Sequence, residues 1–134
     1  MQSHAYVALV SLLAVLLTVW MGIRSALARR QTGLAAPAMG GDPILERNLR
    51  VHGNTLEWLP VFLVSLWLFA IYWNDMVAAA LGLVWIVGRI VYAIGYVAEP
   101  TKRAAGFGIQ ALAVLALMFG ALGRVIWMLA NGMT

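Results

Sequence analysis

A stripe of polar side chains lies just before one of the chain's apolar runs. Its members are separated by four, four and three positions and are Glu46, Arg50, Asn54 and Glu57. Residues at these spacings are neighbours on one face of a helix. A Glu46–Arg50 pair at the polar start of the helix is one interpretation. The apolar run begins directly after Glu57, however, and a buried carboxylate there needs a cationic partner or several donors.

A second stripe lies in a later apolar segment. Its members are separated by three, four, three and four positions and are Arg89, Tyr92, Tyr96, Glu99 and Arg103. Charged residues inside a bilayer normally face the interior of a helix bundle or water. Two interpretations of Arg89 are therefore open, a structural ion pair with Glu57 and a contact with a ligand. Because the tyrosines share this face, we expect them to point into the bundle rather than to form an interfacial belt.

Together the two stripes predict a site in which cations predominate. Arg50, Arg89 and Arg103 supply positive charge, the amide and phenol groups supply directional hydrogen bonds, and Glu57 can accept from an ammonium group. This combination suits a small anionic or zwitterionic ligand from the water side and a lipophilic one from a bilayer. A metal site is not expected, because the chain has no cysteine and its histidines and carboxylates are scattered. The sequence also has no phosphate loop and no dinucleotide fingerprint.

The elements that carry these stripes are predicted to be membrane-spanning helices. Of the 134 residues 63% are hydrophobic and only 10% are charged, whereas soluble domains carry about a quarter charged residues. A spanning helix needs about 20 residues, and four runs qualify, approximately residues 5–23, 51–73, 76–98 and 106–130. The second helix is expected to begin earlier, with Asp42 as N-cap and Pro43 in the first position. The chain is therefore predicted to be one domain over residues 1–134, an all-α membrane protein built as a left-handed up-down four-helix bundle.

The first run also has a signal-peptide alternative, because Ala26-Leu27-Ala28 resembles a cleavage site. The run lacks a positively charged beginning and is long for such a peptide, which favours a retained helix.

The basic residues of the loops predict the orientation in the membrane. They are Arg24, Arg29, Arg30, Arg47 and Arg50 around the first loop, and Lys102 and Arg103 in the third. These two loops share one side of a four-span chain, and the positive-inside rule places that side in the cytoplasm and both termini outside. On these residues alone, Arg29 and Arg30 are typical of a topology anchor or an anionic-lipid contact. We expect the membrane to be a bacterial inner membrane. We expect no nucleic acid partner, because the basic residues flank apolar runs.

Two segments resemble the signatures of a known family. ERNLRVHGNTLEWLP (46–60) is similar to the signature of the MAPEG family, the membrane-associated proteins in eicosanoid and glutathione metabolism, in which E-R-x-x-R is followed by Asn, Glu and Pro. GRIVYAIGYVAEPTKR (88–103) is similar to the family's third-helix pattern of one Arg, two Tyr and a basic residue after the turn. The four-span layout and the Arg-Arg pair after the first helix agree, so the resemblance extends over nearly the whole chain.

The resemblance implies a homotrimer with a glutathione site between neighbouring subunits near the cytoplasmic face. The residues that it assigns to glutathione binding are Arg29, Arg50, His52, Asn54, Glu57, Tyr92 and Tyr96, with Arg89 matching a basic residue buried in the bundle. Arg103 matches an arginine proposed to hold the glutathione thiolate, and Arg30 matches a second catalytic arginine near the lipophilic substrate. A nearby cation lowers the pKa of a thiol from about 8.5. A chain without cysteine would thus take its nucleophile from glutathione.

The expected function is that of a membrane glutathione transferase or peroxidase acting on lipophilic electrophiles or hydroperoxides. The alternative is a non-catalytic lipid-binding or scaffold protein of the same fold, because Trp58 stands where some relatives have Tyr and Glu99 replaces a base found in others. A transporter or channel subunit is disfavoured, since the sequence has neither a ring of charges nor an inverted repeat.

Overall fold

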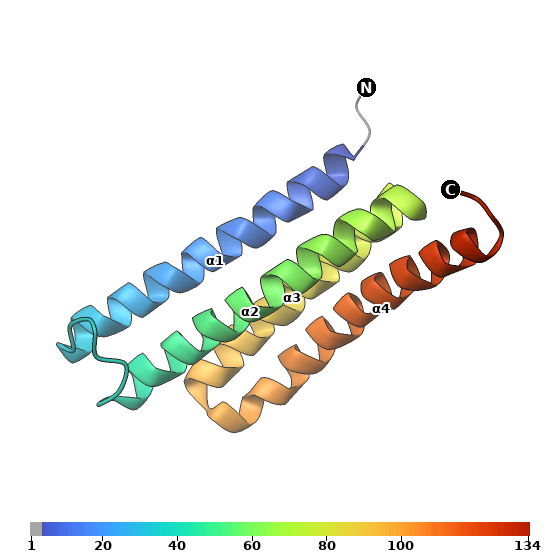
Figure 1. The fold of residues 1–134 in the computed structure, drawn as a ribbon. Coiled ribbons are helices and arrows are strands. Elements are labelled where there is room, and N and C mark those ends of the chain that lie inside the picture. Colours follow the sequence, from blue (N-terminus) through green and yellow to red (C-terminus); the bar gives the residue numbers. More distant parts are fainter. Residues whose placement is uncertain (1–3) are drawn as a thin grey trace.

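The computed structural model describes residues 4–134 as four long helices joined by short connections. They are α1 (Ala5–Thr32), α2 (Pro43–Tyr72), α3 (Asp75–Ala98) and α4 (Arg103–Ala130), with a single 3-10 turn, η1 (Pro100–Lys102), before α4. Figure 1 shows the helices running alternately up and down, with α2 and α3 between α1 and α4. All four are long and apolar enough to cross a membrane. The predicted all-α four-helix architecture is confirmed.

The helices begin where short polar side chains satisfy their free N–H groups. The Asp42 carboxylate accepts from the backbone N–H of Ile44 at 2.8 Å, and Pro43 occupies the first helical position, as predicted. The Asn74 side chain accepts from Val77 N–H at 3.0 Å and starts α3 directly after α2. α1 continues beyond the predicted apolar run to Thr32, where Gly33 adopts φ 71° and ends it. Asp42 therefore fixes the start of the helix that carries the first polar stripe.

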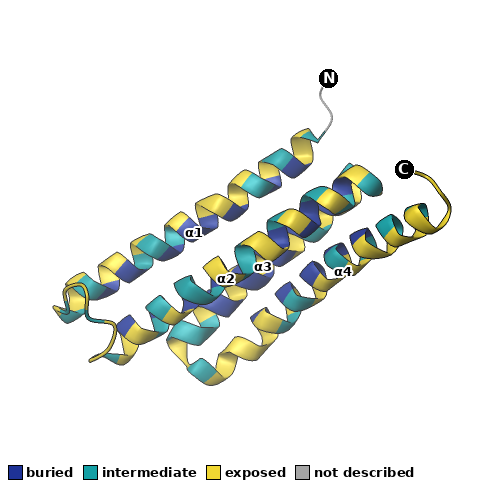
Figure 2. Ribbon diagram, viewed as in Figure 1, coloured by how far each residue is buried: buried dark blue, intermediate teal, exposed yellow. Residues whose placement is uncertain are grey.

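The core lies along the helix faces that point toward one another. In Figure 2 the buried residues follow these inner faces and the exposed residues cover the outside of the bundle. Phe62 of α2 stacks on Trp85 of α3, with ring centroids 3.9 Å apart, and neither side chain is exposed. The outward faces are also apolar, as at Leu12 and Leu112. Such surfaces suit lipid tails or another subunit rather than water.

Helices α3 and α4 approach each other closely at glycines. A Cβ at Gly88 would lie 2.6 Å from the backbone nitrogen of Gln110, and a Cβ at Gly106 would lie 2.5 Å from the Cα of Tyr92. Small residues allow this backbone-to-backbone packing between membrane helices. The first turns of α4 are thereby held against the last turns of α3.

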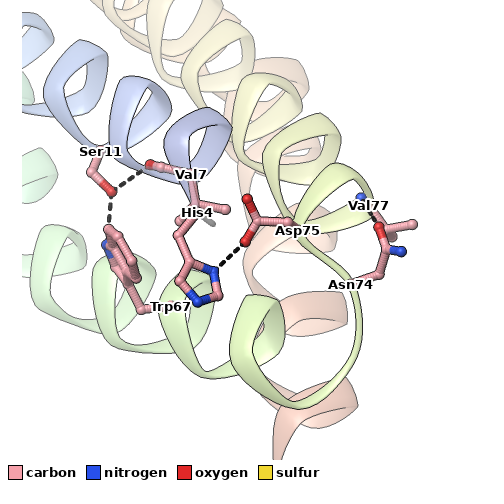
Figure 3. Close-up of polar contacts among 7 residues, drawn as sticks. All are labelled: His4, Val7, Ser11, Trp67, Asn74, Asp75 and Val77. Atoms are coloured by element: carbon pink, nitrogen blue, oxygen red, sulfur yellow. Dashed lines mark hydrogen bonds and ion pairs between the residues drawn. The ribbon is translucent and has the colours of Figure 1, made fainter. Parts of the chain in front are cut away.

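Polar contacts tie the helices together at the end of the bundle that carries both termini (Figure 3). His4 Nδ1 lies 2.6 Å from a carboxylate oxygen of Asp75 and links the start of α1 to the start of α3. The Trp67 indole N–H donates to Ser11 Oγ at 2.8 Å and links α2 to α1. The opposite end of the bundle carries the two basic connections. The two polar stripes meet near that end.

Candidate functional site

A groove of about 1280 Å³ lies between α2, α3 and α4 near the end that carries the basic connections. Its polar lining comprises Glu46, Arg50, Asn54 and Glu57 from α2, Tyr92 and Tyr96 from α3, and Arg103 from α4. The helical spacing of the sequence accounts for this set, since each stripe occupies one face of its helix. The structure therefore brings six of the ten predicted site residues into one groove.

The α2 wall presents charge that the chain itself does not neutralise. The side chains of Arg50 and Glu57 are exposed, and neither forms an ion pair within residues 4–134. The Glu46–Arg50 pair does not form either, because Glu46 instead accepts from the backbone N–H of Gly41 at 3.4 Å. A ligand in the groove would meet a free cation and a free carboxylate on the same wall.

The α3–α4 wall is a stack of aromatic and cationic groups. The rings of Tyr92 and Tyr96 lie 5.6 Å apart, and Tyr92 also packs against Phe107 at 6.1 Å. The Arg103 guanidinium carbon lies 5.6 Å from the centroid of the Tyr96 ring, within cation–π range. Gly95 makes this possible, because a Cβ there would lie 2.7 Å from the Lys102 carbonyl oxygen. Arg103, the first residue of α4, is thus held over the groove.

Arg89 lies behind the groove rather than in it. Its side chain is fully buried and is not part of the groove lining. Its Nη2 donates to Asn54 Oδ1 at 2.8 Å and to Thr55 Oγ1 at 2.7 Å, and its Nε donates to the same hydroxyl at 3.2 Å. The interpretation of Arg89 as the ion-pair partner of Glu57 is therefore wrong. Glu57 is exposed, whereas Asn54 and Thr55 on the same helix bond to Arg89 of α3.

Three other predicted residues lie away from the groove within the subunit. Arg29 Nη1 donates to the carbonyl oxygens of Leu34 and Ala38, at 3.3 and 2.6 Å, and shapes the connection between α1 and α2. Arg30 is exposed near the end of α1. His52 faces α1, where its ring lies 3.4 Å from the Cβ position of Gly22. All three therefore lie on the α1 side of the subunit, because Arg29 and Arg30 are on α1 and His52 faces it. The groove lies on the opposite side, next to α4.

The structure adds residues that sequence reasoning missed. Arg47 donates to the carbonyl oxygens of Val97 and Ala98, at 3.2 and 3.4 Å, and so caps the C-terminus of α3. Thr55 holds the buried guanidinium of Arg89. Phe107 forms an apolar part of the groove wall and packs edge-on against Trp58 at 5.9 Å. Phe107 could have been found, because it lies four residues after Arg103 on the same helical face.

The chemistry of the groove is that of an anion or zwitterion site beside apolar surface. Glu99, which replaces a base found in some relatives, lies 3.7 Å from Lys102 in an exposed pair rather than in the groove lining. No group of three His, Cys, Asp or Glu side chains that could hold a metal occurs in the described part of the chain. The groups available to a ligand are guanidinium, amide, phenol and carboxylate groups.

Comparisons with known proteins show the family of the chain. The family model of the MAPEG family matches residues 7–123. The chain is 45% identical to the Synechocystis protein sll1147 over 122 residues, which cover 91% of this chain and 89% of that one. It is 37% identical to human microsomal glutathione S-transferase 2, covering 87% of this chain and 80% of the relative. It is 35% identical to guinea pig (Cavia porcellus) leukotriene C4 synthase, covering 85% and 76%.

Proposed function

The chain belongs to the MAPEG family and is an integral multi-pass membrane protein, and from this premise we propose that it is a membrane-bound glutathione transferase or peroxidase. The names of its relatives, glutathione S-transferase and leukotriene C4 synthase, support glutathione as co-substrate. The single observation that carries the proposal is the shared groove of Arg50, Tyr96 and Arg103. No lining residue is a thiol, so the nucleophile is the thiol of the bound tripeptide.

The groove residues have complementary roles toward glutathione. Arg50 pairs with a carboxylate of the tripeptide, and Glu57 accepts from its ammonium group. Asn54, Tyr92 and Tyr96 supply directional hydrogen bonds. Arg103 lies nearest the thiol, where its fixed charge lowers the thiol pKa and increases the thiolate fraction at neutral pH.

The thiolate then attacks a lipophilic partner that enters from the bilayer. In the transferase reaction the sulfur forms a bond to an electrophilic carbon, and the electron pair of the broken bond stays with the leaving group or the adjacent atom. In the peroxidase reaction the sulfur attacks the terminal oxygen of a hydroperoxide, the O–O bond breaks, and the other oxygen takes up a proton and leaves as an alcohol. A second glutathione then reduces the resulting sulfenic acid, giving glutathione disulfide and water. Phe107 gives the groove an apolar surface beside Arg103, on which the lipophilic partner can lie next to the thiolate. Holding the two reactants together in this way increases the reaction rate by proximity.

The remaining predicted residues are proposed to act across a subunit boundary. Arg29, Arg30 and His52 belong to the α1 side of the subunit, whereas the groove lies on the α4 side. In a ring of identical subunits, the α1 side of one subunit faces the α4 side of its neighbour. We therefore propose a homotrimer in which a neighbour's Arg29 and His52 complete the glutathione site and its Arg30 acts near the lipophilic substrate.

We also propose that the groove faces the cytoplasm of a bacterial cell, with both termini outside the inner membrane. Both termini lie at the end of the bundle opposite the two basic connections (Figure 1). The positive-inside rule supports this orientation. The thiol substrate would then enter from the cytoplasm.

The test is the ultraviolet absorbance of the glutathione thiolate when glutathione is added to the purified protein. We expect a thiolate signal with the wild type and its loss in Arg103→Ala. Lys102→Ala is the matched control, because it removes the same charge one residue away without touching the groove. A signal that persists in Arg103→Ala, or that falls equally in both variants, would contradict the role of Arg103.

The second candidate is a non-catalytic lipid-binding protein of the same fold. The packing of Trp58 against Phe107 favours it, because it adds an apolar ring next to a residue that lines the groove. Turnover of a generic electrophile such as chlorodinitrobenzene separates the two functions. Conjugate formation above the uncatalysed rate excludes this candidate, whereas binding of lipid without any conjugate supports it.

A further inference from the structure

A polar network behind the groove connects the buried Arg89 to two residues of the groove wall. We propose that Arg89 is a positioning residue for the thiol ligand. It holds the side-chain amide of Asn54 with the NH2 group toward the groove, and it supports Tyr92 from behind. This inference rests on the proposed function, because it assigns a role within the same site.

The orientation of Asn54 follows from hydrogen-bond chemistry. A guanidinium group has donors and no acceptor, so the atom that Asn54 turns toward Arg89 must be its carbonyl oxygen. The distance from Arg89 Nη2 to Asn54 Oδ1 is 2.8 Å. The opposite end of the planar amide, the NH2 group, is then directed away from Arg89, and Asn54 lines the groove. The groove therefore presents an N–H donor at this point rather than an amide that can turn either way.

Arg89 is itself held by residues that no ligand in the groove touches. Thr55 Oγ1 accepts from both Nε and Nη2 of Arg89, and the Thr55 hydroxyl donates to the Val51 carbonyl oxygen at 2.9 Å. Thr55 and Arg89 are both fully buried. Because Nε and Nη2 of Arg89 both bond to Thr55, whose own hydroxyl is bonded to Val51, the orientation from which the guanidinium holds Asn54 is fixed.

The same guanidinium supports the other groove wall. The Cζ of Arg89 lies 4.4 Å from the ring centroid of Tyr92. Tyr92 packs against Tyr96, and the Arg103 guanidinium lies over the Tyr96 ring in a cation–π contact. One buried side chain thus contacts Asn54 on α2 and Tyr92 on α3, so it sets the separation of the groups that face a ligand.

The charge of Arg89 also favours an anionic ligand. Within residues 4–134, no carboxylate lies within ion-pair distance of it, and its Nη1 is buried without a hydrogen-bond partner. A charge in a low-dielectric interior acts over a longer distance than one in water. Salt also screens it less than it screens the exposed Arg50 and Arg103.

The experiment is a double-mutant cycle on glutathione affinity, measured by thermal-shift titration of the purified full chain in detergent. Arg89→Lys keeps the charge and loses the forked donor geometry. We expect it to weaken the Kd about tenfold in the wild-type background. In the Asn54→Ala background we expect a change below about threefold, because the amide that Arg89 positions is gone. Equal fold-changes in both backgrounds, or no change in the wild type, overturn the inference.

A second variant keeps the proposal testable if the Arg89 variants do not fold. Asn54→Asp retains an acceptor for Arg89 but has no NH2 group. We expect its thermal midpoint to stay the same or rise while its Kd for glutathione weakens about tenfold, including at high salt, where repulsion between exposed charges is screened. Wild-type affinity in Asn54→Asp refutes the assigned orientation.

Asn48→Ala is the matched control. Asn48 is a buried amide on the same helix that donates to the Ile44 carbonyl oxygen and does not line the groove. Its loss should lower the thermal midpoint without changing the Kd. A wild-type protein that shows no glutathione shift refutes the proposed function as well. A wild type that binds glutathione, together with Arg89→Lys and Asn54→Asp variants of equal affinity, refutes only the positioning role.

Discussion

The close approach of α3 and α4 makes Gly106 the position where one added methyl group should damage the site most. A Cβ at Gly106 would lie 2.5 Å from the Cα of Tyr92 and 2.8 Å from the carbonyl oxygen of Gly88. Ordinary van der Waals contact begins near 3.4 Å. Gly106→Ala therefore requires the two helices to separate locally by at least about 0.9 Å, because the backbone nitrogen of Tyr92 lies closer still to the Cβ position and backbone atoms cannot rotate away.

This separation should cost stability and affinity together. Inserting a methyl group into a packed interface costs about 1–3 kcal/mol, and the rigidity of both backbones favours the upper end of that range. For a chain of this size, about 3 kcal/mol lowers the thermal midpoint by about 10 °C. Arg103 lies three residues before Gly106, and Tyr92 lies opposite it. A displacement near 1 Å in such a site can reduce its activity about a hundredfold.

The assay compares thermal midpoints and glutathione Kd values of Gly106→Ala and Gly123→Ala in the same detergent. Gly123 lies on the same helix, and a Cβ there meets nothing within 4 Å. Its substitution should raise stability by up to about 1 kcal/mol through helix propensity and leave the Kd unchanged. If the two variants have the same thermal midpoint and affinity, the backbone contact between α3 and α4 does not exist as described.

Two further predictions concern the start of α2 and the orientation. Asp42→Ala should lower the free energy of unfolding by about 1 kcal/mol, because the Ile44 N–H loses its acceptor. Asp42→Asn should retain most of this stability, because asparagine is also a good N-cap. Thermal midpoints of the two variants test both expectations. Because the chain has no cysteine, single cysteines report topology unambiguously. In intact bacterial cells an impermeant maleimide should label Met133→Cys but not Ala36→Cys, and the reverse pattern would exclude a cytoplasmic groove.

Much of the architecture could be predicted because it depends on local patterns. The apolar runs determined the number of spanning helices, and Asp42 and Asn74 are side chains whose capping chemistry acts within a few residues. Helical periodicity put Arg50 and Tyr96 on the faces that meet. Such predictions need no knowledge of how the helices pack.

The residues behind the groove could not be predicted in this way. Whether Arg89 bonds to Glu57 or to Asn54 and Thr55 depends on the rotation of α2 about its axis, and adjacent residues on a helix point about 100° apart. The distance between α3 and α4 likewise depends on which glycines face a backbone. Gly106 does and Gly123 does not, although both are glycines within the same helix.

The buried arginine lowers the stability of the core, and this supports a functional reason for it. A buried charge without a carboxylate partner is costly, and among the described residues Nη1 of Arg89 and Nε2 of Gln110 are buried donors that have no acceptor. An apolar side chain of similar volume would remove the cost of the charge. Departures from stable packing are expected at functional sites, and Arg89 lies directly behind Asn54 and Tyr92 of the groove wall. An anion bound in front of that wall would offset part of the cost, so the free protein should be the less stable form.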